Sequence, residues 1–215
     1  MKDSSINLNK VDKMAGLSLE NALRLHFDSI LLFKNQSYPS AYFLSVLALE
    51  EIGKAFLIMN FLYHSYTDGR MEEKWEEKFL KLIYSHHAKQ NSFAYNLDSP
   101  MPSSKFFKSL YSGELEILKQ NSVYVGLDRK HRKVNLKSKI NNPLKINKAK
   151  AQKQITNVND CLLELTLGVT KEVYIMDATS VEKILNKPLL TKLRKSWSLV
   201  SSKTKLELNK LEKIK

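Results

Sequence analysis

Two short segments of the chain combine acidic, basic and imidazole side chains at spacings that suit proton transfer. In the first, Ala48-Leu-Glu-Glu-Ile-Gly-Lys54, two carboxylates precede an ammonium inside an otherwise apolar stretch. Glu50 lies four residues and Glu51 three residues before Lys54, so either carboxylate can reach the ammonium on one helix face. Two interpretations stay open. The charges form a buried ion pair that fixes helix packing, or they form a desolvated cluster that binds or transforms a substrate.

The second segment, Tyr84-Ser-His-His-Ala-Lys89, places two imidazoles beside a lysine. Imidazole exchanges protons near neutral pH and lysine can hold a phosphate, so His86, His87 and Lys89 suit acid/base cleavage of an RNA backbone. The alternative is that both histidines are surface or helix-capping residues. Adjacent histidines on a helix point about 100° apart, and no HExxH-type pair accompanies them, so we predict no metal site and no cofactor.

The positive charge of the chain is concentrated in its second part. Residues 1–128 carry 14 basic and 15 acidic side chains, whereas residues 129–215 carry 21 and 7. The densest block, residues 129–153, holds ten basic side chains and no acidic one. Such a block attracts RNA by counterion release, or it is a solvated face that only keeps the protein soluble. Our candidates for RNA contact are Lys81, Tyr124, Arg129, Lys130, Arg132, Lys133, Lys137 and Lys139. For Tyr124, burial beside two valines is the alternative to base stacking.

Helical periodicity runs through almost the whole chain, and this predicts an all-α fold. With only 6 Gly and 5 Pro, the sequence has too few turn formers for a many-stranded sandwich, barrel or propeller. Six helices are expected, with approximate bounds Ser18 (as the cap) to Lys34, Ser40 to Tyr66, Met71 to Asn91, Ser103 to Gln120, Asn147 to Ala178, and Thr179 to Asn186. A short β-like run is expected at Ser122–Val125. The chain should end in a basic, weakly helical tail at Leu189–Lys215.

The most apolar stretch, residues 41–63, has the length of a membrane span. Glu50, Glu51 and Lys54 interrupt it near its centre, where each charge would cost about 3 kcal/mol in a bilayer. We therefore predict a buried helix of a soluble bundle, with no membrane partner. The N-terminus lacks a basic start followed by an apolar run, and the single Cys161 cannot form an internal disulfide. Both observations favour a cytoplasmic location, with Cys161 as a small buried residue.

The two chemical segments and their order resemble a known family. The segment from Ser40 to Lys54, the HHAK run at 86–89 and the SVYV run at 122–125, followed by a basic stretch and a further helix, resemble the AbiV-type abortive infection proteins of the HEPN superfamily. The resemblance covers roughly residues 16–178. It implies an α-helical bundle, usually dimeric, in a bacterial phage-defence protein that stops growth or translation of the infected cell. Many HEPN proteins are metal-independent ribonucleases whose site forms at the dimer interface.

The sequence departs from the best-known ribonuclease motif of this superfamily, an Arg followed four to six residues later by His. No Arg precedes His86 or His87 at that spacing; Lys81 stands five positions before His86 and lacks the bidentate fork of Arg. We predict a flexible N-terminus over residues 1–15, a HEPN-like bundle over 16–178 with a basic irregular insertion at 126–146, and a basic helical extension over 179–215.

These observations favour an RNA-directed toxin, a metal-independent ribonuclease that shuts down translation or growth of infected cells. In the expected mechanism His86 or His87 is the general base or acid. Lys54 and Lys89 stabilise the phosphate, and Glu50 or Glu51 orients them.

Two alternatives remain: a non-catalytic module that blocks translation by binding RNA or the translation machinery through the basic block, and a helical structural subunit. We also expect a homodimer, because the few helices of a small bundle offer too little cover for the apolar helix at 41–63, and a phage-encoded activator as a further partner.

Overall fold

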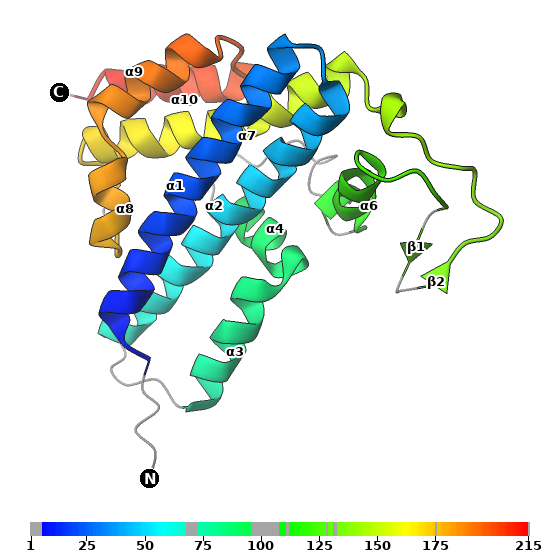
Figure 1. Ribbon diagram of the computed structural model, residues 1–215. Helices are drawn as coiled ribbons and strands as arrows, with labels where there is room; N and C mark the ends of the chain where they lie inside the picture. The colour runs from blue at the N-terminus through cyan, green and yellow to red at the C-terminus, as the bar shows by residue number, and fades with distance from the viewer. Residues whose placement is uncertain are drawn as a thin grey trace.

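The centre of the molecule is a hairpin of two long helices, α1 (Leu8–Lys34) and α2 (Tyr38–Thr67), which pack side by side along most of their length (Figure 1). The computed structural model describes residues 6–67, 73–95, 108–110, 112–127, 129–130, 133–174 and 176–214. The remaining helices pack around this hairpin, so the predicted all-α bundle is confirmed.

Helix α1 begins eleven residues earlier than the sequence pattern predicted. Its cap is Asn7, whose side chain accepts a hydrogen bond from the backbone N–H of Lys10, whereas Ser18 lies buried inside the helix. The helix extends to its real start because Val11 and Ala15 continue the buried stripe. The prediction of a flexible segment over residues 1–15 is therefore wrong for residues 8–15, and residues 1–5 lie outside the described part of the chain.

Helix α2 is buried on most sides, as its apolar composition predicted. It packs against α1, α7 (Lys148–Thr170) and α4 (His86–Tyr95) of the same chain. The expectation that a second copy is needed to cover this helix therefore loses its reason, and the dimer stays a prediction. Among the described residues, no helix combines the length and apolarity that a membrane span requires.

The helix expected from Met71 to Asn91 is two helices. Helix α3 (Glu73–Tyr84) ends before Ser85, and α4 starts immediately after it (Figure 1). Ser85 caps α4, since its hydroxyl accepts a hydrogen bond from the backbone N–H of Ala88 at 3.3 Å. The two histidines therefore stand at the beginning of α4 and not at the end of a longer helix.

The chain beyond α4 leads to α6 (Glu114–Asn121) and then to an arm, residues 122–147, that projects from the bundle (Figure 1). One helix was expected over residues 103–120. The structure has helical residues at 108–110 and the separate helix α6, and residues 103–107 lie outside the described part. The SVYV run forms a turn and extended coil, not a strand.

The arm carries a two-stranded antiparallel ribbon, β1 (Arg129–Lys130) with β2 (Lys133–Val134), followed by the short 3-10 helix η1 (Pro143–Lys145). The other described residues of the arm have irregular backbone, with an isolated bridge between Gly126 and Asn141. The bounds expected for the basic irregular insertion, residues 126–146, stay a prediction.

The last part of the chain folds over α7. Helix α7 ends at Thr170, earlier than predicted, and is followed by α8 (Thr179–Ile184), α9 (Lys187–Ser196) and α10 (Ser202–Glu212). Helices α9 and α10 contact α7, and α8 contacts α1. The helical C-terminal extension is therefore packed onto the bundle.

Two titratable groups of α1 and α7 lie deep in the core. His26 is fully buried, and its Nε2 lies 3.1 Å from Oδ1 of Asn159. Burial lowers the pKa of His26 to about 4, because charging the ring would leave a cation out of water. Cys161 is also buried, and burial raises the pKa of its thiol. As expected, this cysteine behaves as a small core residue.

Candidate active site

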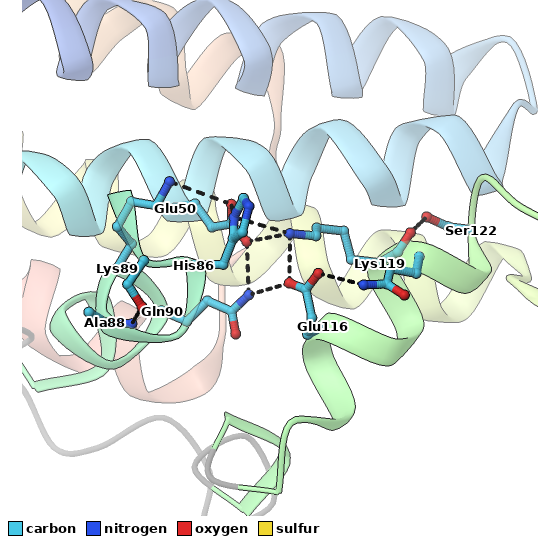
Figure 2. A network of polar contacts seen from close by, with 10 residues as sticks. Glu50, His86, Ala88, Lys89, Gln90, Glu116, Lys119 and Ser122 are labelled. Carbon is cyan, nitrogen blue, oxygen red and sulfur yellow. Dashed lines mark hydrogen bonds and ion pairs between the residues drawn. The ribbon is translucent and has the colours of Figure 1, made fainter. Parts of the chain in front are cut away.

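A buried carboxylate, Glu50 of α2, is the centre of a polar cluster built from three helices (Figure 2). Its side chain is only 2 % exposed. Oε1 accepts hydrogen bonds from Gln90 Nε2 and Lys119 Nζ, both at 2.8 Å, and Oε2 lies 2.6 Å from His86 Nδ1. Lys89 Nζ approaches Oε2 at 4.0 Å. Both oxygens of the buried carboxylate are therefore bonded, which offsets the cost of removing the charge from water.

Gly53 explains how α4 comes close enough to reach Glu50. A Cβ atom at Gly53 would lie 1.9 Å from the backbone oxygen of Lys89 and 3.2 Å from the backbone nitrogen of Phe93. Only a residue without a side chain allows α4 to cross α2 at this distance. The ALEEIGK segment thus supplies both the carboxylate at the centre of the cluster and the gap that admits its partners.

His86 connects the buried carboxylate to the surface. Its side chain is 55 % exposed, although Nδ1 points at Glu50. An ionised carboxylate can only accept, so the 2.6 Å contact assigns the proton to Nδ1 and leaves the lone pair on Nε2. Lys119 Nζ lies 3.4 Å from the same Nδ1 and acts on it through its charge. Within the described residues no group bonds Nε2, which is free to take a proton from a ligand.

Helix α6 adds the third part of the cluster. Lys119 is almost fully buried, and its ammonium bridges Glu50 at 2.8 Å and Glu116 at 2.6 Å. Burial works to raise the pKa of Glu116, but the hydrogen bond and charge of Lys119, with a hydrogen bond from Gln120, outweigh it and lower this pKa. Two carboxylates, Glu50 and Glu116, and two ammonium groups, Lys89 and Lys119, therefore face one another around His86.

Glu50, His86 and Glu116 also form the one group, among the described residues, with the geometry of a metal site. One ligand atom from each lies within 4.8 Å of the others. A set of two carboxylates and an imidazole suits a transition metal. The ammonium of Lys119 already bonds both carboxylates, so a metal would have to displace it.

The structure brings together only part of the predicted catalytic set. Glu50, His86 and Lys89 meet, whereas Glu51 and Lys54 are half-buried on α2 and form no hydrogen bond or ion pair within the described chain. The predicted pairing of either carboxylate with Lys54 is therefore wrong. Glu50 turns instead to partners on other helices, because α4 and α6 offer donors at bonding distance.

His87 stands apart from the cluster. It is exposed, and its Nδ1 lies 3.1 Å from the side-chain nitrogen of Asn91 one turn later on α4. Of the two histidines that the sequence left as equivalent candidates, only His86 contacts the buried carboxylate.

Three residues of the cluster were not predicted: Gln90, Glu116 and Lys119. Glu116 and Lys119 are three apart on α6, and Gln90 follows His86 by four positions on α4. These spacings are common on exposed helices, so they carry a weak signal in the sequence. Their burial beside Glu50 depends on how α4 and α6 pack.

The candidates for RNA contact lie on α3 and on the arm. The Lys81 side chain on α3 is 81 % exposed. Lys137 and Lys139 on the arm are exposed as well. Tyr124 is 67 % exposed, so the alternative of burial beside its two valine neighbours is wrong. Arg132 lies outside the described residues, and of Arg129, Lys130 and Lys133 only the backbone is described.

Comparison with known proteins identifies the family. The HEPN_AbiV family model, described as AbiV, matches residues 10–164. This range holds the hairpin of α1 and α2 and the whole Glu50 cluster. No curated protein and no solved structure matches the chain. Because the family model covers most of its length, the chain belongs to the AbiV family of HEPN abortive-infection proteins.

Proposed function

We propose that this protein is an RNA-directed toxin that acts as a metal-independent ribonuclease, with His86 as its proton acceptor. The observation that supports this most is the contact between Glu50 and His86. It holds Nδ1 on a buried carboxylate and leaves Nε2 free on an exposed side chain. A carboxylate that orients an imidazole and stabilises the imidazolium formed on it is a recurrent acid/base arrangement in enzymes.

In the proposed reaction, Nε2 of His86 takes the proton from a ribose 2′-hydroxyl. The 2′-oxygen attacks the neighbouring phosphorus, and the bond from phosphorus to the 5′-oxygen breaks. The departing oxygen takes a proton from water, to which the exposed side of His86 is open. The products are a 2′,3′-cyclic phosphate and a 5′-hydroxyl, and the nucleophile comes from the RNA itself.

The two lysines of the cluster have different roles in this proposal. Lys119 is bonded to two carboxylates, so it positions Glu50 and through it His86. Lys89 is buried, with a side chain 10 % exposed, and approaches Glu50 at 4.0 Å only; the proposal assigns its remaining donors to a phosphate oxygen that enters the cluster. A cation that meets the charge developing on the phosphate stabilises the transition state, as a metal does in other nucleases.

The adjacent histidines provide a matched test. We expect purified protein to cleave single-stranded RNA in EDTA, His86→Ala to lose at least about 100-fold in rate, and His87→Ala to keep most of its activity, since positioned acid/base groups contribute about 10²–10⁴-fold. Growth arrest on expression should follow the same order. An equal loss in both variants, or activity that depends on an added divalent metal, would contradict the proposed role of His86.

A second candidate function rests on the arm. The exposed Tyr124, Lys137 and Lys139 suit RNA binding without cleavage, in which case the protein would block translation by occupying RNA or the translation machinery. A His86→Ala protein that still arrests growth while binding RNA would favour this alternative over the ribonuclease.

A further inference from the structure

The exposed face of α3 carries an open depression beside the start of α4. Its walls are Glu77, Leu80, Lys81 and Tyr84, which share one face of the helix, together with Ser85, and its volume is about 560 Å³. Tyr84 is 75 % exposed, an unusual position for a large aromatic side chain. The catalytic role proposed for the Glu50 cluster does not use this surface.

The side chains of the depression suit a nucleotide. A tyrosine ring offers a flat face for base stacking, and Leu80 adds apolar surface next to it. The Lys81 side chain is 81 % exposed, and its ion pair with Glu77, at 3.9 Å, is long and solvated, so its ammonium can hold a phosphate. The volume lies within the range of small-ligand sites.

The depression lies close along the chain to His86, the proposed proton acceptor. Only Ser85 separates Tyr84 from His86, so the Cα atoms of these two residues lie at most about 7 Å apart. The two residues are therefore close enough along the backbone for neighbouring nucleotides of one strand to contact both.

We propose that this depression is a nucleobase subsite that takes one unpaired base of single-stranded RNA, with Tyr84 as the stacking residue and Lys81 on the adjoining phosphate. The proposal rests on the ribonuclease function above and names its substrate class. A base inside a duplex has both faces covered by its neighbours and cannot stack on a side chain without leaving the helix. The subsite therefore selects single strands.

The charge of the subsite predicts how its binding responds to salt. The stacking residue Tyr84 is uncharged, whereas Lys81 supplies a single phosphate contact. Removing Tyr84 should weaken binding with little change in the slope of log affinity against log salt. Removing basic residues of the arm should change that slope.

Binding of a tetranucleotide that contains 2-aminopurine and 2′-O-methyl groups tests the proposal without cleavage, because the blocked 2′-oxygen cannot react. The fluorescence of the base falls when it stacks. We expect Tyr84→Ala to weaken binding about 5- to 140-fold, as stacking energies imply. Tyr84→Phe should bind like the wild type. Tyr66→Ala serves as the control, since it removes a tyrosine of similar exposure at the end of α2.

The outcomes separate this proposal from the proposed function. If Tyr84→Ala binds as tightly as wild type, or if the wild type does not bind the tetranucleotide or prefers its duplex, the subsite is refuted, even where the protein cleaves RNA. If binding depends on Tyr84 and favours single strands while RNA stays uncut, the subsite is supported and the proposed ribonuclease function is refuted.

Discussion

Replacement of Gly53 by alanine tests the packing that builds the candidate site. The new Cβ would lie 1.9 Å from the Lys89 carbonyl oxygen, whereas ordinary van der Waals separation begins at 3.4 Å. Helices α2 and α4 would have to separate by about 1.5 Å, because the opposing atoms are backbone and cannot rotate away. The distances from Glu50 to His86 and Gln90, now 2.6 and 2.8 Å, would then exceed hydrogen-bond length.

The sign of the effect follows from three terms. Alanine in place of glycine inside a helix favours folding by about 1 kcal/mol. Overpacking costs about 1–3 kcal/mol, and loss of the bonds to a buried carboxylate costs about 3 kcal/mol, part of which Lys119 retains by staying bonded to Glu50. The net expectation is a loss of about 2–4 kcal/mol in the free energy of unfolding, or about 5–15 °C in Tm for a chain of this size.

Urea denaturation and thermal scans by circular dichroism measure this loss. Gly126→Ala is the control, since a Cβ there meets nothing within 4 Å, and it should leave Tm within about 1–2 °C of the wild type. A Gly53→Ala protein as stable as wild type, with RNA cleavage unchanged, would refute the argument that close approach of α4 to α2 assembles the cluster.

Further predictions concern the core, the arm and assembly. Because burial lowers the pKa of His26 from 6.5 to about 4, its contribution to stability is present above pH 6.5 and is lost as pH falls toward 4, by up to about 3 kcal/mol; urea titrations across this range should show the loss in wild type and not in His26→Gln. Cys161 should react with a thiol reagent only as fast as the chain unfolds, measured by labelling with and without urea. Glutamate at four basic positions of the arm should weaken RNA binding without lowering Tm, and the salt slope should flatten by about 0.7–0.9 for each phosphate that the variant no longer binds; unchanged affinity would reduce the block to a solvated face. The four positions are Arg129, Lys130, Arg132 and Lys133. Light scattering at micromolar concentration should give the mass of a homodimer, because the arm exposes several large aliphatic side chains to solvent.

The periodicity of the sequence was enough to predict the helices, and less so their ends. Helix α1 shows why, since Ser18 looks like a cap only when the Val11 and Ala15 positions before it are overlooked. The break between α3 and α4 was missed for a similar reason. No Gly or Pro interrupts residues 73–95, and the one local signal is the serine itself, a residue that favours helix starts.

The sequence predicted the residue types of the candidate site better than it predicted which side chains bond one another. Glu50 and Glu51 are adjacent and have similar neighbours, so nothing in the sequence distinguishes the one that faces α4. A lysine four residues away also looked like the natural partner of Glu50. The real partner, Lys119, lies 69 positions along the chain. Pairing over such distances depends on tertiary packing, which helical periodicity does not encode.

Helix α6 joins the candidate site to the arm. Lys119 of this helix bonds Glu50. Two residues later, the backbone oxygen of Asn121 accepts a hydrogen bond at 2.9 Å from the side chain of Asn141, where the arm returns to the bundle. The same Asn141 side chain bonds the backbone oxygen of Tyr124 at 3.1 Å, which closes the base of the arm. RNA held by the arm would therefore be anchored on the helix that positions Glu50. Under the proposed function, binding on the arm and proton transfer at His86 depend on one element, so substitutions that loosen α6 should impair both.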